Sequence, residues 1–245
     1  MKNTFLKTKN VKMFTTLMDT LKNLPVNVPK MALVYGEQGL GKTETLLWWV
    51  MQNYDIAIYV RANNKMTSRW LMHDILSQLD TSRYGRLEDN FNAIEKQLKV
   101  NPKIIIVDEV DYLIANKSIE TLRDIHDKTG IPIVLVGMAD CDRKLSKLSH
   151  IYGRLYSILK FQAFNKQDIN EIVTSLSDIE FSDDAIDFIA NKTNKFREIA
   201  KIIDKIEKLS KTNSIDYVDA EVIRNLLYER KNIATLQTPK YVQFG

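Results

Sequence analysis

The sequence holds one cysteine, three histidines, eight glycines and five prolines in 245 residues, and each scarcity excludes a class of structure. A single thiol, Cys141, cannot form an internal disulfide, which is typical of a reducing compartment. We expect Cys141 to be a small buried core residue. Histidine and cysteine do not occur at zinc-ligand spacing. So few glycines and prolines leave little room for long flexible linkers.

Long hydrophobic runs are also missing. No run approaches the roughly 20 apolar residues that a membrane helix needs, and the basic segment 1–10 is not followed by the apolar stretch of a signal peptide. We therefore expect a cytoplasmic protein without a membrane partner. The net charge of +4 is compatible with a polyanionic partner but does not require one, because solvated helix faces would account for it equally well.

Short apolar runs alternate with helical periodicity through the first two thirds of the chain. This alternation predicts an α/β fold with a mainly parallel, five-stranded sheet between two layers of helices. The predicted strands are Met31–Tyr35, Ile56–Val60, Lys103–Val107, Ile131–Val136 and Ser157–Phe161. The predicted helices cover residues 8–24, 43–53, 67–79, 87–100, 118–129 and 141–149.

A glycine-rich segment follows the first predicted strand. Residues 36–43, GEQGLGKT, fit the pattern G-x-x-x-x-G-K-[ST] and stand between a strand and a helix, as a phosphate-binding loop requires. Gly36, Gly39 and Gly41 let successive backbone amides point at phosphate oxygens, at the positive end of the next helix. Lys42 should reach the β- and γ-phosphates and Thr43 should ligate magnesium, so ATP and Mg²⁺ are the expected cofactors.

Two carboxylates end the third predicted strand. Asp108 lies where ligands bind in open α/β sheets, at the carboxyl end of a strand, and would hold magnesium mostly through its water shell. Glu109 is the candidate for activating water against the γ-phosphate. A solvated acidic turn is the alternative, since Asp111 lies close behind. One strand also intervenes between the loop and the acidic pair, as in the additional-strand, catalytic-Glu P-loop ATPases.

The chain has a phosphate-binding loop, the Asp108-Glu109 pair, Arg154 before the fifth strand and a helical module after about residue 165. With these features it resembles AAA+ ATPases over residues 8–230. The resemblance implies an ATPase core with an N-terminal helix at 1–164 and a helical lid at 165–232. Residues 233–245 would form a tail, either disordered or docked on a neighbour. The motifs predict an enzyme that hydrolyses ATP to ADP and phosphate.

The same resemblance implies further roles. Arg154 would be the catalytic arginine finger that reaches the nucleotide of a neighbouring subunit, with Arg143 as runner-up. Arg197 would touch the nucleotide from the lid. Met138 stands where AAA+ proteins usually place a polar sensor of the γ-phosphate, which leaves Asp140 as the substitute.

Within this class the chain looks most like the phage Mu B and TnsC type of transposition target-selection ATPases. The basis is its layout and the segment 59–62, YVRA, before a helix start that bears lysine and arginine. That resemblance implies an oligomer, a helical filament or ring, that forms on double-stranded DNA with ATP and directs a transposase to it. The predicted DNA contacts are Asn63, Asn64, Lys65, Thr67, Arg69 and Lys117.

Two other functions fit the sequence. A helicase loader or insertion-sequence helper ATPase would act on single-stranded DNA, and Trp70 is the nearby aromatic residue that could stack on bases. A signalling ATPase would switch a protein effector without DNA, and the mild charge neither favours nor disfavours it.

Overall fold

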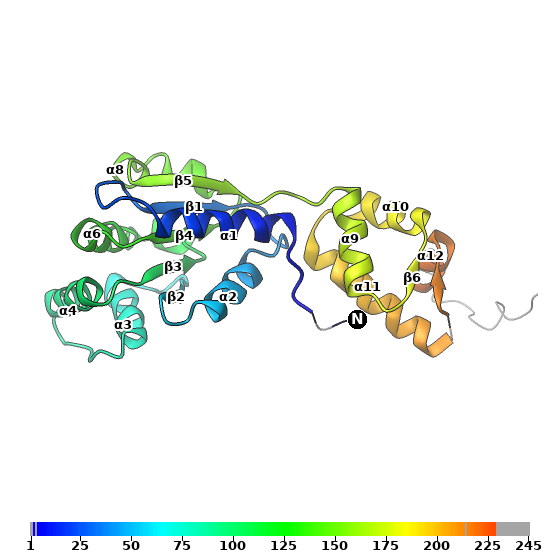
Figure 1. The fold of residues 1–245 in the computed structure, drawn as a ribbon, viewed down its shortest axis with the longest axis horizontal. Helices are drawn as coiled ribbons and strands as arrows, with labels where there is room; N and C mark the ends of the chain where they lie inside the picture. The colour runs from blue at the N-terminus through cyan, green and yellow to red at the C-terminus, as the bar shows by residue number, and fades with distance from the viewer. Residues whose placement is uncertain (1, 3, 214, 229–245) are drawn as a thin grey trace, which may run out of the picture. The chain divides into compact units, whose positions relative to one another are not determined.

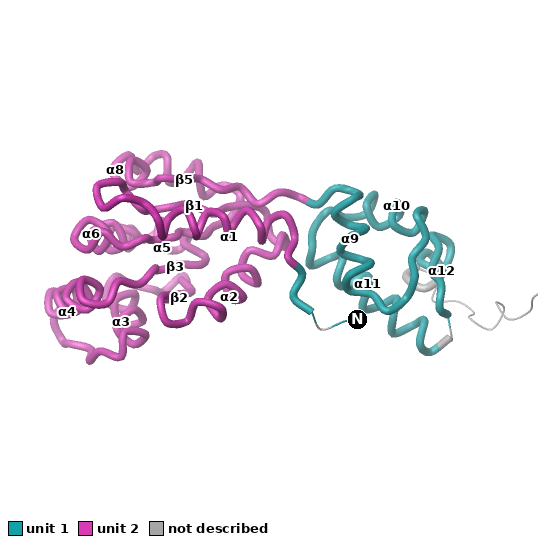
Figure 2. The backbone as a smooth tube through the Cα atoms, viewed as in Figure 1, with its two compact units in different colours: residues 1–6, 164–245 teal, residues 7–163 magenta. Residues whose placement is uncertain are grey.

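The computed structural model describes residues 2, 4–213 and 215–228, which fall into two units (Figures 1 and 2). One unit spans Lys7–Ala163 and the other comprises Met1–Leu6 and Phe164–Gly245. The first residues thus group with the helical unit rather than with the predicted core, and the Lys2 amide donates to the Leu176 carbonyl at 2.8 Å. The predicted tail, 233–245, lies outside the described residues.

Five parallel strands form the core sheet in the order β2-β3-β4-β1-β5, which confirms the predicted α/β class. In space β4 lies between the loop strand β1 and the acidic strand β3, and β2 and β5 form the edges. The strands are β1 Met31–Tyr35, β2 Ala57–Arg61, β3 Ile104–Asp108, β4 Ile133–Gly137 and β5 Leu155–Lys160.

Helices cover both faces of the sheet. The central strands are therefore buried at nearly every residue, whichever face the side chain lies on. Met31, Ile105 and Ile133 pack into one cluster with residues of α3, α4 and α6, while α1 and α2 contact each other and strands β5 and β2. These helices are α1 Lys9–Lys22, α2 Lys42–Gln52, α3 Ser68–Gln78, α4 Leu87–Val100 and α6 Glu120–Thr129.

Three short helices differ from the prediction. α5, Asp111–Ala115, was not predicted, and the helix expected at 141–149 is divided into α7, Cys141–Leu145, and α8, Ser149–Tyr152. A helix of four or five residues presents little more than one turn, so hydrophobic periodicity cannot define its ends. Cys141 is buried, as expected.

The helical unit, residues 1–6 and 164–245, contains helices α9 Lys166–Leu176, α10 Asp183–Lys192, α11 Phe196–Asn213 and α12 Ala220–Tyr228. The helical pattern was predicted, but a small parallel pair of strands, β6 Glu180–Phe181 and β7 Tyr217–Val218, was not. Two residues are too few to show the alternation that marks a strand. Within the described parts of both units, no helix combines the length and the apolar character needed to cross a membrane.

Candidate nucleotide site

The predicted phosphate loop lies at the carboxyl end of β1 and leads directly into α2. Its glycines Gly36, Gly39 and Gly41 have φ angles of 156°, 82° and 86°, which L side chains rarely adopt. A Cβ on Gly36 would also lie 3.1 Å from the Phe161 carbonyl oxygen. Backbone and packing therefore both demand glycine at the start of the loop.

The Lys42 ammonium lies within this loop. It donates to the carbonyl oxygens of Gly36, at 2.6 Å, and Glu37, at 2.8 Å. Gly41 is the N-cap of α2, and no side chain caps the helix there. The first turn thus presents backbone amides and a cation at one point, which is the chemistry of an anion site.

Asp108 is the buried acidic centre of the site, with 3% of its surface exposed. Its Oδ2 accepts hydrogen bonds from the Thr43 hydroxyl at 2.8 Å and the Tyr59 hydroxyl at 3.2 Å, and its Oδ1 accepts the Glu109 amide at 2.9 Å. A hydroxyl that gives its proton to Asp108 keeps its oxygen lone pairs for a cation. The Thr43 and Asp108 oxygens therefore fit magnesium, which binds through few protein ligands plus water and phosphate.

Glu109, next to Asp108 in the sequence, is engaged in an ion pair. Its φ of 56° is in the left-handed region, and its Oε1 accepts from Nε of Arg61 at 3.1 Å and from the terminal guanidinium at 2.5 Å. Arg61 is directly opposite Asp108 in the β2–β3 register. Sequence reasoning did not identify Arg61 or Tyr59 as site residues, because only the strand order shows that β2 borders the acidic strand.

Met138, which occupies the usual sensor position, and Asp140, the expected substitute, both have partners. The Met138 amide donates to Asp111 Oδ2 at 2.7 Å, and its sulfur accepts from the side-chain amide of Gln38, a residue of the phosphate loop, at 3.8 Å. Asp140 forms an ion pair with Lys144 at 3.0 Å. The hydrogen bond from Lys144 lowers the pKa of the Asp140 carboxyl.

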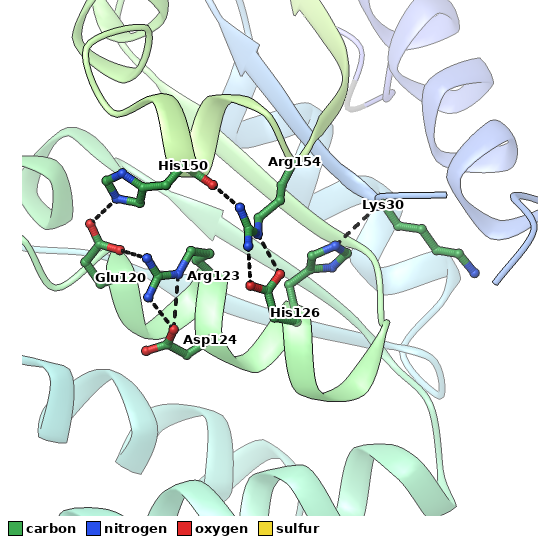
Figure 3. A network of polar contacts seen from close by, with 8 residues as sticks. Lys30, Glu120, Arg123, Asp124, His126, His150 and Arg154 are labelled. Atoms are coloured by element: carbon green, nitrogen blue, oxygen red, sulfur yellow. Dashed lines mark hydrogen bonds and ion pairs between the residues drawn. The ribbon is translucent and has the colours of Figure 1, made fainter. Parts of the chain in front are cut away.

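Arg154 lies at the amino ends of the strands, whereas the loop lies at their carboxyl ends, because Arg154 directly precedes β5 and the strands are parallel. Its guanidinium makes a bidentate pair with Asp127 of α6, 2.6 Å on each side, and also donates to the His150 carbonyl. The bond to Arg154 lowers the pKa of Asp127. Figure 3 shows this network, which continues through His150, Glu120 and Arg123. Arg143, the runner-up, has 77% of its side chain exposed and lies 3.9 Å from Asp140.

Arg197, the residue expected to contact nucleotide from the lid, lies in the helical unit and is exposed in the first turn of α11. This unit also contains Asn165-Lys166-Gln167-Asp168, a literal match to the guanine-reading pattern N-K-x-D of GTPases. In the structure these residues begin α9 as a capping box. Asn165 accepts from the Asp168 amide at 2.9 Å, and Asp168 accepts from the Asn165 amide at 2.7 Å. The pattern is used here for helix capping.

The predicted DNA contacts gather at two adjoining loops. The Asn116 side chain donates to the carbonyl of the buried Met66 at 2.6 Å, which ties the β2–α3 loop to the turn after α5. Thr67 caps α3 by accepting from the Trp70 amide at 3.3 Å, and Asn63 accepts from the Lys65 amide at 2.9 Å. The predicted contacts that are exposed here are Asn64, Lys65, Thr67 and Lys117 on the loops and Arg69 in the first turn of α3.

The sequence of this chain is similar to those of known proteins. Residues 27–145 match the family described as AAA domain. A "Potential ATP-binding protein" of Staphylococcus aureus is 23% identical over 259 residues, covering 89% of this chain and 93% of the relative.

The fold also resembles solved structures. The Aeropyrum pernix ORC2 protein, solved in ADPNP and ADP complexes, has a TM-score of 0.70 at 16% identity, over 95% of this chain and 71% of that chain. The ORC1 protein of the same organism, solved in complex with DNA, has a TM-score of 0.61 at 16% identity, over 89% and 63%. At these identities the similarity establishes the fold alone.

Proposed function

We propose that the chain is an ATPase that assembles on double-stranded DNA when ATP is bound, a proposal that starts from the match of residues 27–145 to the AAA domain family. The observation that carries the proposal is the convergence of Lys42, Thr43 and Asp108 around one glycine-rich loop. The S. aureus relative is named as a potential ATP-binding protein, which supports the same ligand.

Each residue has a distinct task in hydrolysis. Lys42 and the loop amides bind the phosphates, while Thr43 and Asp108 would hold a magnesium ion, which would supply positive charge to neutralise the phosphates. Glu109 accepts the proton of the water that attacks the γ-phosphorus, and ADP leaves as the bridging oxygen bond breaks. In the described geometry Glu109 is bound to Arg61, so this ion pair has to open before Glu109 can act.

The DNA-binding part of the proposal rests on the adjoining loops around Lys65 and Lys117. Exposed lysine, arginine and amide side chains suit contacts to phosphates, which give affinity without sequence preference. Such binding weakens steeply as salt rises. The ORC1 neighbour was solved with DNA, so a related fold is compatible with this ligand.

The resemblance to the Mu B and TnsC type adds a finer proposal, that the assembly on DNA directs a transposase. ATP would join subunits, and hydrolysis would release them. Sequencing of insertion sites should then show insertions clustered near DNA occupied by the protein. Insertions distributed identically with and without the protein would remove the transposition role but leave the DNA-dependent ATPase intact.

One observation favours the single-stranded alternative. Trp70 is 43% exposed at the start of α3, beside the proposed DNA loops, and its side chain is hydrogen-bonded to Asp74. An exposed, oriented indole can stack on unpaired bases. Competition between duplex and single-stranded oligonucleotides separates the two, since a single-strand binder would prefer the latter and would lose that preference in Trp70→Leu.

Sedimentation with duplex DNA and a slowly hydrolysed ATP analogue tests the leading proposal. The parent should pellet with DNA only when the analogue is present, Lys42→Ala should remain in the supernatant, and Glu109→Gln should pellet even with ATP. Lys65→Ala should weaken DNA binding, with Lys99→Ala on α4 as the control for loss of one positive charge. Monomers that bind ATP without DNA-dependent assembly would contradict the proposal.

A further inference from the structure

The Tyr59 hydroxyl has no part in the hydrolysis described above, yet it lies against the acidic centre. Tyr59 is half-buried on β2, and its hydroxyl donates to Asp108 Oδ2 at 3.2 Å. A phenol carries its proton at physiological pH, so the hydroxyl is the donor in this contact.

The hydrogen bonds of Asp108 leave a defined opening. An ionised carboxylate has about four lone-pair directions, two on each oxygen. Oδ2 uses both, for Thr43 and Tyr59, and Oδ1 uses one, for the Glu109 amide. Among the described residues no donor takes the remaining direction, on Oδ1, and this direction would suit a water of a magnesium ion held by Thr43.

The hydroxyl is not needed to hold the strand. The side-chain amide of Gln78 already binds the Tyr59 backbone, accepting from its N–H at 2.9 Å and donating to its carbonyl at 2.5 Å. These two bonds close the exposed edge of β2 at this residue without using the side chain of Tyr59. The phenol oxygen is thus left to act on the carboxylate alone.

We propose that Tyr59 is a positioning residue for the magnesium ion: its hydroxyl fixes the rotation of the Asp108 carboxylate, so that Oδ1 faces the waters of the metal. The inference rests on the proposed nucleotide-binding function and goes beyond it. Magnesium demands near-ideal octahedral geometry, whereas calcium accepts irregular coordination. Loosening the carboxylate should therefore cost magnesium more than calcium.

Metal titrations of the full chain test this inference without relying on turnover. Binding of a fluorescent ATP analogue is followed as Mg²⁺ or Ca²⁺ is added, for the parent and for Tyr59→Phe. The variant should need about tenfold more Mg²⁺ for half-saturation, the lower end of the cost of removing an outer-shell partner. The rise for Ca²⁺ should be smaller, and analogue binding in EDTA should not change.

Tyr152→Phe is the matched control, because its hydroxyl also donates to an aspartate, Asp142 at 3.1 Å, outside the nucleotide site. Its Mg²⁺ titration should equal that of the parent. Tyr59→Met also lacks the hydroxyl, carries the same expectation and serves if the Tyr59→Phe variant does not fold. In a chain that already carries Asp108→Asn, adding Tyr59→Phe should cause no further change in the Mg²⁺ titration.

The outcomes distinguish a failure of the proposed nucleotide-binding function from a failure of the positioning role of Tyr59. If the parent binds no ATP analogue with any metal, the proposed function fails and the inference falls with it. If the parent binds with Mg²⁺ and a folded Tyr59 variant titrates identically, or loses Ca²⁺ and Mg²⁺ affinity equally, the positioning role alone is overturned.

Discussion

His126 is a buried residue whose ring nitrogens both have partners. Nδ1 lies 2.9 Å from the Ile131 carbonyl, and Nε2 accepts the Lys30 amide at 3.5 Å (Figure 3). This pairing needs a neutral ring with its proton on Nδ1. Burial accordingly lowers the pKa of His126 below the ordinary value of 6.5.

The lowered pKa predicts an acid-sensitive fold. Below 6.5 the unfolded chain binds a proton at this position that the folded chain rejects, so stability is lost as pH falls through that value towards the folded pKa. The free energy of unfolding, from urea titrations between about pH 5 and 7.5, should fall less steeply for His126→Gln than for the parent. Parallel curves would show that His126 does not titrate between the two states.

Arg61 and Glu109 give a prediction on catalysis. Arg61→Ala removes the ion-pair partner of Glu109, so the carboxylate becomes free to activate water. Basal ATP turnover should rise severalfold, and stimulation by DNA should shrink. Lys99→Ala on α4 removes a single ion pair, with Glu95, outside the nucleotide site and serves as the control. A fall in turnover, with nucleotide affinity unchanged, would mean that Arg61 assists Glu109 instead of restraining it.

At the level of elements, β4, α5 and α7 meet around Gly137. A Cβ there would lie 2.4 Å from the Cys141 sulfur and 2.8 Å from Asp111 Oδ2. Gly137→Ala should therefore lower the free energy of unfolding by about 1–3 kcal/mol, the usual cost of overpacking. Gly85→Ala, where an added Cβ meets nothing within 4 Å, should leave the unfolding midpoint nearly unchanged. Equal midpoints for both variants would contradict the close approach at Gly137.

The elements also show what sequence alone can predict. The strand Met31–Tyr35 and the loop after it were predicted from local patterns, because burial on both faces makes a strand uniformly apolar and the loop requires glycines at fixed spacing. The Tyr59–Asp108 and Arg61–Glu109 contacts were not predicted, since they join residues 49 and 48 positions apart. They depend on strand order, which no local pattern encodes.

At the scale of the whole molecule, the position of Arg154 bears on assembly. β1 is five residues long, so its amino and carboxyl ends are about 16 Å apart. Arg154 lies at the amino ends of the strands and the phosphate loop at their carboxyl ends, and a guanidinium at the amino ends does not reach the loop of its own chain. Any contact of Arg154 with nucleotide therefore has to be made to another subunit.

Mixing two inactive variants tests this contact. Arg154→Ala keeps Glu109 but lacks the guanidinium, and Glu109→Gln keeps the guanidinium but lacks the base; each alone should lose about 10³-fold in turnover. Their mixture should regain activity, because Arg154 of one variant can serve the intact site of the other. Asp127→Asn, which breaks only the ion pair with Arg154, should retain turnover. Two results together would contradict this role: a mixture that regains no turnover, and an Asp127→Asn variant that loses as much turnover as Arg154→Ala. Arg154 would then be a structural link between α6 and β5, and Arg143→Ala would be the next variant to mix.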